Sequence, residues 1–149
     1  DILVMGGRTD TDKPETKGSM KGAEFGSADG LSFDHRGVLW IQTDVSSSTI
    51  NSKDYKGMGN NQMVATIPGT NEFRRFLTGP RGCEITGIAF TPDNRTLFIN
   101  IQHPGEPSEG LSDPQHPTAV SSWPDGDKAG RPRSSTVVIV KADGGIIGT

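Results

Sequence analysis

The sequence predicts an all-β fold built from β-propeller blades, each a sheet of four antiparallel strands. The composition favours short strands joined by turns over a helical bundle, because 20 Gly and 10 Pro stand among 149 residues and hydrophobic residues make up only 31%. The apolar residues also occur in short runs, and one pattern of runs and turns recurs after 57 residues, from Gly30 to Gly87. An internal repeat of this kind is typical of propeller blades.

The first copy of the repeat contains four predicted strands. Gly30–Asp34 and Val38–Asp44 flank the tight turn His35–Gly37, as in a β-hairpin. Gln62–Ile67 and Glu72–Leu77 follow as the third and fourth strands, with the turn signal Pro-Gly-Thr-Asn between them. We therefore expect a complete antiparallel meander in this region.

The second copy follows the same order. Ile85–Phe90 and Thr96–Gln102 flank the turn Thr91–Arg95, in which a proline precedes Asp-Asn. Ser135–Lys141 is predicted as the third strand, and Ile146–Ile147 as the beginning of a fourth. The second and third strands of this copy are separated by a much longer loop than in the first copy.

The repeat divides the chain into three parts. Residues 1–24 are expected to hold the end of a preceding blade, with Ile2–Met5 as its strand, and a polar loop; residues 25–80 form one blade, and residues 81–149 a second with a long Pro-rich loop at about 103–134. Propellers close with about 4–8 blades, so we expect a fragment of a larger propeller. The remainder of the propeller, or self-association of the chain, would then cover the open sheet edges.

Charge and cysteine usage exclude several classes of protein. The net charge of −3, with scattered Lys and Arg, offers no basic field for nucleic acid. No apolar run approaches the roughly 18 residues of a membrane span. The single cysteine, Cys83, forms neither an internal disulfide nor a cysteine metal cluster, and we expect it to be buried as a small hydrophobic residue.

Polar residues with site chemistry are predicted at one end of both blades, because strand direction alternates in a meander. Carboxylate and amide oxygens there suit a hard cation such as Ca²⁺, although an Asp-Gly turn or a capping Asn also explains each residue alone. An arginine in Gly-Pro-Arg-Gly suits bidentate phosphate binding, or a salt bridge to a nearby carboxylate. A histidine beside a proline is either a ligand or an ordinary loop residue. The residues concerned are Asp29, Asp44, Asn60, Asn61, Arg81, Glu84 and His103.

Several longer motifs in order resemble the C-terminal portion of the PhoX-type alkaline phosphatases, over about residues 25–148. They are Ala28–Leu31, Leu39–Asp44, Gly57–Met63, Gly79–Gly87, Phe98–Glu106 and Trp123–Gly126. The resemblance implies a β-propeller phosphatase that hydrolyses phosphate monoesters with calcium and iron (Fe³⁺) ions at the channel mouth. It also implies a periplasmic or secreted protein exported by the Tat pathway.

The resemblance carries roles onto the matching positions. It implies that Glu84 and Asp29 are metal ligands and that Arg81 contacts phosphate in catalysis; Asn61, Asp44 and His103 are secondary candidates. The cysteine that bridges iron in the family is expected outside this chain, so that role is not given to Cys83. The isolated chain is expected to be inactive and to hold Ca²⁺ alone or no metal.

Two other functions remain open at this point. A gluconolactonase-like hydrolase also places a divalent cation on carboxylate and Asn ligands in a propeller, and a non-catalytic propeller would serve only for binding. The sequence lacks a Walker loop, a His-Glu-x-x-His helix and a Gly-x-Ser-x-Gly elbow. The ordered motifs of the resemblance, together with the polar end of the blades, make metal-dependent phosphate ester hydrolysis the first expectation.

Overall fold

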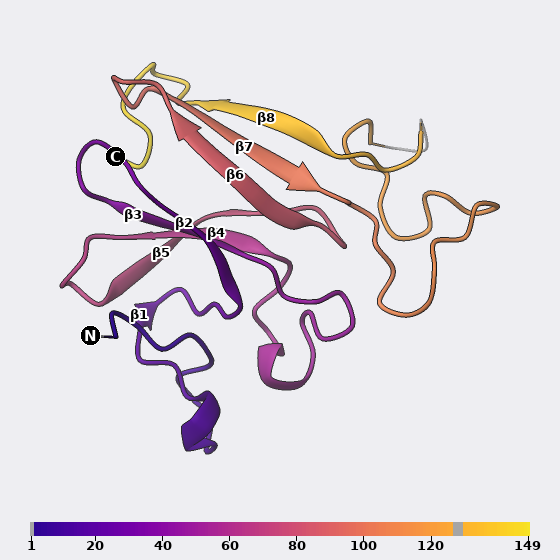
Figure 1. Cartoon of the computed structure of the whole chain (residues 1–149), viewed down its shortest axis with the longest axis horizontal. Helices are drawn as coiled ribbons and strands as arrows, with labels where there is room; N and C mark the ends of the chain where they lie inside the picture. Colours follow the sequence, from indigo (N-terminus) through magenta and orange to yellow (C-terminus); the bar gives the residue numbers. More distant parts are fainter. Residues whose placement is uncertain (1, 127–129) are drawn as a thin grey trace.

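A computed structural model describes residues 2–126 and 130–149 as two β-sheets that pack on one another (Figure 1). The first sheet has the order β1-β5-β4-β3-β2 and the second the order β6-β7-β8. The elements are η1 (Pro14–Thr16), β1 (Lys21–Gly22), β2 (Ala28–Phe33), β3 (Leu39–Thr43), η2 (Lys53–Tyr55), β4 (Gln62–Thr66), β5 (Glu72–Thr78), β6 (Glu84–Phe90), β7 (Thr96–Gln102) and β8 (Ser135–Val140). The all-β prediction is confirmed for the described residues.

The first sheet contains the predicted meander and one strand that the sequence did not indicate. β2 to β5 pair antiparallel in chain order, while β1 adds in parallel to β5, with Lys21 opposite Glu72. The strand predicted at Ile2–Met5 is wrong. The backbone of Met5 instead bonds to Ser19, accepting from its N–H at 2.9 Å and donating to its hydroxyl at 2.9 Å. This pairing, with a residue 14 positions further along the chain, uses the Met5 N–H and carbonyl that a sheet would need.

The second sheet has three strands, so the strand predicted at Ile146–Ile147 is also wrong. After the turn that follows β8, the chain leaves the sheet and crosses to the first one. The Ile147 side chain is only 1% exposed, and its N–H donates to the Asn94 carbonyl at 2.9 Å. Burial between the sheets therefore takes precedence over pairing with β8.

An apolar core fills the space between the two sheets. Trp40 of β3 is the largest side chain in it, and its ring lies 5.0 Å from Phe76 edge-on and 5.4 Å from Phe90. Alternation along the strands sends every second residue to this core. Its other buried members are Met63, Cys83, Ile85, Leu97, Ile99, Ile101 and Ile147.

A second core lies on the opposite face of the first sheet. There Leu39, Ile41, Val64 and Phe73 pack against Met20 and Phe25 of the N-terminal segment. The cover is incomplete, because Leu31 and Phe33 of β2 remain 64% and 61% exposed. On the outer face of the second sheet, Phe98, Val138 and Val140 are likewise exposed.

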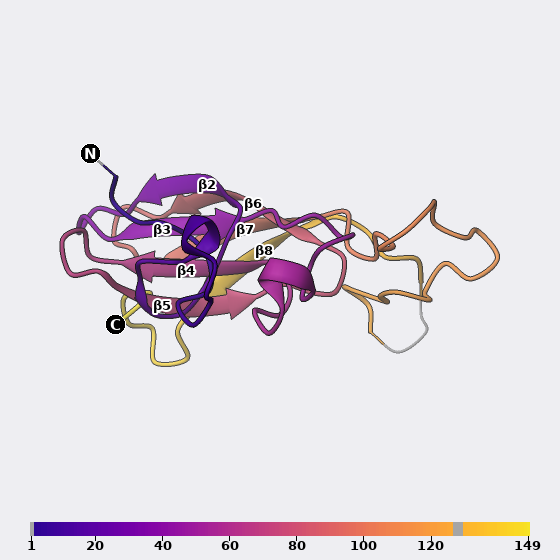
Figure 2. The same cartoon turned by 90° about the horizontal axis from the view of Figure 1, so that it is seen from below.

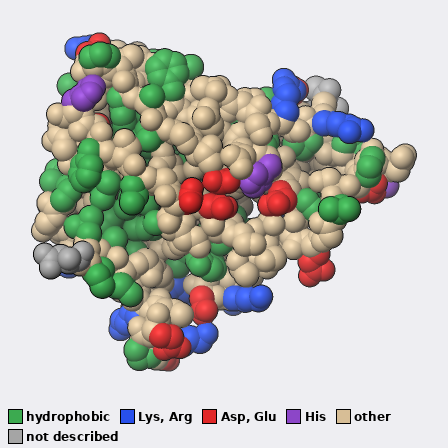
Figure 3. Space-filling view, viewed as in Figure 1, with side chains coloured by type: hydrophobic (Ala, Val, Ile, Leu, Met, Phe, Trp, Pro, Cys, Tyr) green, Lys and Arg blue, Asp and Glu red, His purple; other side chains and the backbone are tan. Residues whose placement is uncertain are grey.

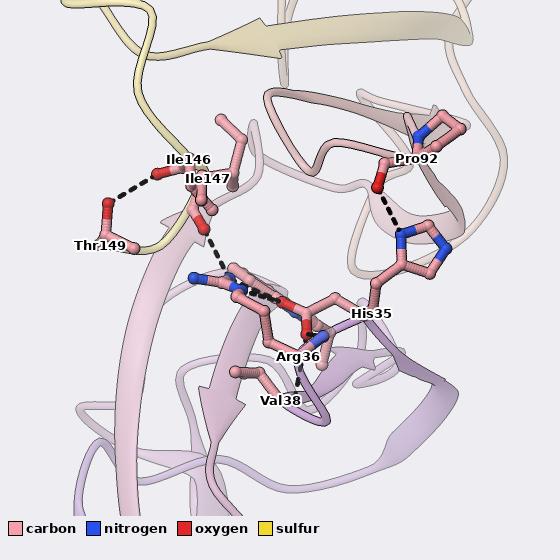
Figure 4. A network of polar contacts seen from close by, with 9 residues as sticks. His35, Arg36, Val38, Pro92, Ile146, Ile147 and Thr149 are labelled. Atoms are coloured by element: carbon pink, nitrogen blue, oxygen red, sulfur yellow. Dashed lines mark hydrogen bonds and ion pairs between the residues drawn. The ribbon is translucent and has the colours of Figure 1, made fainter.

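Polar contacts between turns join the sheets at the end shown in Figure 4. The ring of His35 lies 3.1 Å, through Nδ1, from the Pro92 carbonyl oxygen. Arg36 donates to the Ile147 carbonyl at 2.7 Å and to the Asp34 carboxylate at 2.6 Å. Asp34 thus fixes an arginine that reaches the C-terminal segment.

The long loop after β7 extends away from both sheets, as Figures 1 and 2 show from two directions. Helical structure in the described residues is confined to two three-residue 3₁₀ turns, and no helix there has the length and apolar character to cross a membrane.

Candidate functional site

Three carboxylates gather at the end of the sheets where β2 and β6 begin and β3 ends. Glu84 is the first residue of β6, Asp44 follows β3 directly, and Asp29 is the extra residue of a β-bulge in β2. Bulges re-aim side chains out of the regular ladder. In the space-filling view of Figure 3, acidic side chains lie beside a histidine near the centre of the molecule. Strand direction puts the three residues at the same end of the sheets, and the packing of the two sheets and the bulge in β2 decide how near they come.

The electrostatics of Glu84 reflect this crowding. Its side chain is 12% exposed. Burial raises the pKa of the Glu84 carboxyl above its ordinary value, and the negative charges of Asp44 and Asp29 add to the rise, while the His103 ring opposes it. The ring lies 3.4 Å, through Nε2, from Glu84 Oε2. A bound cation would relieve the same repulsion between the carboxylates.

Arg81 lies exposed in the turn that leads into β6. No carboxylate in the described parts of the chain comes within ion-pair distance of its guanidinium. The turn itself is held in place, because the Arg81 carbonyl accepts a hydrogen bond from Gly105 at 2.9 Å and the Gly82 carbonyl accepts one from Glu106 at 3.1 Å. The salt-bridge explanation for Arg81 gains no support, and its donors are available to an anion.

Asn61 is engaged within the protein. It is 2% exposed, and its Oδ1 accepts from Thr43 Oγ1 at 2.9 Å and from the Val45 N–H at 2.7 Å. Its Nδ2 donates to the carbonyls of Val45 and Cys83, which links the first sheet to the beginning of the second. Asn60 donates to the Gly79 carbonyl at 3.3 Å. These bonds give Asn61 a structural role in positioning the strand that carries Glu84.

Cys83 is buried, as the sequence indicated, with 2% exposure. Burial raises the pKa of its thiol to about 12, and the neighbouring Glu84 charge adds to the effect. The thiol is therefore protonated at neutral pH, and its sulfur packs in the core between the sheets.

The structure adds two residues that the sequence did not single out. Glu106 lies three residues after His103, and its carboxylate approaches His103 Nδ1 at 3.7 Å. Gln42 on β3 is 1% exposed, yet its amide has no hydrogen-bond partner among the described residues. It pairs with Gly30, next to Asp29, and stands two residues before Asp44. Only the i, i+3 spacing of His103 and Glu106 was visible in the sequence.

The donor chemistry of this end fits part of a cation site. Carboxylate oxygens are the ligands that Ca²⁺ prefers, and an unpartnered buried amide beside them offers another polar group. Within residues 2–126 and 130–149, however, no group of three or more His, Cys, Asp or Glu side chains converges closely enough to hold a metal ion by itself. These residues would therefore supply only some of the ligands.

Comparisons with known proteins identify a family for the chain. The chain matches the family described as alkaline phosphatase PhoX over residues 1–105. It is similar to the solved structure of Pseudomonas fluorescens PhoX in complex with vanadate, a transition state analogue, with 45% sequence identity and a TM-score of 0.82. The match covers 98% of this chain and 24% of that one, so the chain spans about a quarter of that structure. No curated protein matches the chain.

Proposed function

Because this chain belongs to the PhoX alkaline phosphatase family, we propose that it forms part of a longer, metal-dependent phosphatase that hydrolyses phosphate monoesters. The observation that carries the proposal is the position of Arg81 on the turn leading into Glu84, at the end of the sheets where Asp29 and Asp44 also lie. An anion-binding side chain beside clustered carboxylates suits a substrate whose phosphate is held between an arginine and cations. The similarity to a vanadate-bound phosphatase supports this interpretation.

The residues have complementary tasks in this reaction. A phosphate monoester dianion repels a nucleophile, and bound cations supply the charge that neutralises its oxygens. Glu84 and Asp29 would hold such a cation, with Asp44 adding negative charge nearby. Ca²⁺ suits this oxygen donor set, and Fe³⁺ is proposed for ligands elsewhere in the full-length protein. Arg81 binds two phosphate oxygens and stabilises charge on the transferring group.

The lactonase and binding-only alternatives gain no support from the comparisons, which identify a phosphatase family. We further propose that the full-length protein is exported, so that activity is expected in the periplasmic or secreted fraction. The isolated chain is expected to be inactive, because the described residues provide only part of a metal site.

Substitutions in the full-length protein test the proposal. We expect Arg81→Ala to lower kcat/KM for p-nitrophenyl phosphate by about 10²–10³-fold, since one charged donor set is lost. Glu84→Gln should weaken Ca²⁺ binding and lower Ca²⁺-dependent activity. Arg74→Ala is the matched control, because Arg74 is an exposed arginine paired with Glu72 on β5. Wild-type kinetics in both Arg81→Ala and Glu84→Gln would remove these assignments.

A further inference from the structure

The turn His103–Glu106, which follows β7, contacts the Gly79–Glu84 segment through both backbone and side chain. His103 has a positive φ of 35° and Gly105 a φ of 89°. Left-handed backbone is uncommon for a residue with a side chain and is maintained where surrounding contacts determine it. The contacts around His103 therefore hold the turn in this conformation.

Backbone hydrogen bonds connect this turn to the segment that carries the proposed phosphate contact. Gly105 donates to the Arg81 carbonyl at 2.9 Å, and Glu106 donates to the Gly82 carbonyl at 3.1 Å. The N–H of His103 donates to Ser134 Oγ at 3.0 Å, next to the start of β8. The turn is thus bonded both to the Arg81 segment, which precedes β6, and to Ser134, which precedes β8.

The side chains of the same turn connect it to Glu84. The His103 ring lies between two carboxylates, with Nε2 3.4 Å from Glu84 Oε2 and Nδ1 3.7 Å from Glu106 Oε2. The Glu84 side chain is 12% exposed and that of His103 is 40% exposed, so the ring joins a nearly buried carboxylate to the surface. Glu106 approaches Nδ1, the ring nitrogen on the side away from Glu84.

These contacts involve the Glu84 carboxylate and the Arg81 segment, and the proposed function requires these two groups to be fixed relative to one another. We propose that the turn His103–Glu106 is a positioning element for the site: the His103 ring orients the Glu84 carboxylate, Glu106 orients the ring, and the backbone holds the Arg81 segment. This inference rests on the proposed function and assigns His103 as a positioning residue rather than as a metal ligand or a group that contacts substrate.

The test uses His103→Asn and Glu106→Gln in the full-length protein. Asn tolerates the positive φ of position 103 but is too short to span both carboxylates. Outer-sphere groups of this kind change metal affinity or activity by about 10- to 100-fold. We expect His103→Asn to weaken Ca²⁺ binding, measured by calorimetry, by about 10- to 100-fold. It should lower kcat by a similar factor. KM for p-nitrophenyl phosphate should change little, because Arg81 stays held by the backbone.

His116→Asn is the matched control. His116 lies in the same loop and pairs with Asp113 three residues before it at 2.7 Å, but its side chain is 75% exposed and makes no contact with Glu84 in the described structure. It should leave Ca²⁺ affinity and kinetics as in the wild type. Glu106→Gln keeps the size of the side chain and the backbone, so it tests the positioning role if His103→Asn fails to fold. It should also lower Ca²⁺ affinity.

The outcomes separate this inference from the proposed function. Wild-type Ca²⁺ affinity and kcat in folded His103→Asn, or in Glu106→Gln when His103→Asn does not fold, would overturn the positioning role while leaving the phosphatase proposal intact. A full-length wild-type protein that neither binds Ca²⁺ nor hydrolyses p-nitrophenyl phosphate would overturn the proposed function itself, and the positioning role with it.

Discussion

The Asp34 carboxylate, whose side chain is fully buried, connects the turn between β2 and β3 to the core. It accepts hydrogen bonds from the Arg36 guanidinium, from the N–H groups of Arg36 and Val38, and from Trp40 Nε1. Burial works against its ionisation, but the bonds from Arg36, Trp40 and Val38 outweigh this and hold the pKa of Asp34 below its ordinary value. Ionised Asp34 therefore stabilises the folded protein.

The sign of this effect predicts a pH dependence. The unfolded chain takes up the proton near the ordinary Asp pKa of about 3.9, and the folded chain only at lower pH. The contribution of Asp34 is complete above about pH 4 and is lost as the pH falls through its folded pKa. We expect Asp34→Asn to lower the free energy of unfolding by about 3 kcal/mol at pH 7, with a smaller loss at pH 3, measured by denaturant titration.

A second Arg–Asp pair provides the control for this prediction. Arg8 and Asp10 are also two residues apart, and Arg8 Nε and Nη2 donate to the two carboxylate oxygens of Asp10 at 2.9 and 2.8 Å. Asp10, however, is exposed. Water screens such a pair, so Asp10→Asn should change stability far less than Asp34→Asn. Equal effects of the two substitutions, or an Asp34→Asn effect independent of pH, would contradict the account.

Individual site residues differ in how far the sequence could reveal them. Asp29, Asp44 and Glu84 lie at the same end of the sheets, which strand alternation predicts, while their roles as ligands stay predictions. The bond of Asn61 to the Cys83 carbonyl was not predictable, since it depends on the approach of the two sheets. The unpartnered amide of Gln42 was equally hidden, because a polar residue in a strand looks the same whether it is buried or exposed.

At the level of elements, Trp40 of β3 links a strand of its own sheet, β5, to a strand of the second sheet, β6. Its indole lies edge-on to Phe76 of β5 and tilted against Phe90 of β6, and it is 1% exposed. Aromatic pairs of this geometry add to the stabilisation from apolar burial. Gly148 packs over the same ring, so the C-terminal segment also depends on it.

Truncation of the Trp40 side chain should weaken the packing between the two sheets and so destabilise the folded protein. We expect Trp40→Ala to lower the free energy of unfolding by about 3–5 kcal/mol, from lost burial and the cavity that remains. Trp40→Phe keeps one ring and should lose distinctly less. Chemical denaturation followed by circular dichroism measures both. Stability close to wild type in Trp40→Ala would show that the sheets do not depend on this contact.

The strands themselves were well predicted, with β2 to β8 ending within two residues of their expected limits. Alternation and turn residues are local signals, and they hold because each strand has one face on a core. Two predicted strands are wrong: Ile2–Met5, which precedes the first meander, and Ile146–Ile147, the expected fourth strand of the second. Their course depends on long-range partners, namely Ser19 and Asn94, which no local pattern encodes.

Across the whole molecule, the outer face and one edge of the second sheet are uncovered. In the described structure β8 pairs only with β7, and Phe98, Val138 and Val140 are 37%, 57% and 61% exposed. Open edges and exposed apolar sheet faces promote association with another chain or another part of the same protein. The sequence indicated this from the two repeat copies, but the propeller and its number of blades remain a prediction.

We therefore expect the isolated chain to self-associate, as measured by sedimentation velocity. Val138→Lys places a charge in the middle of the exposed face and should shift the distribution towards monomer. Thr118→Lys adds the same charge in the long loop and should not. A wild-type chain that sediments as a clean monomer would contradict the expectation.

The contact between His35 and the Pro92 carbonyl spans 57 residues, which is also the interval of the repeat. Equivalent positions of the two copies therefore touch each other. Because the second copy contributes only a backbone carbonyl, the contact requires a particular side chain in the first copy alone, and the proline at the position equivalent to His35 is compatible with it.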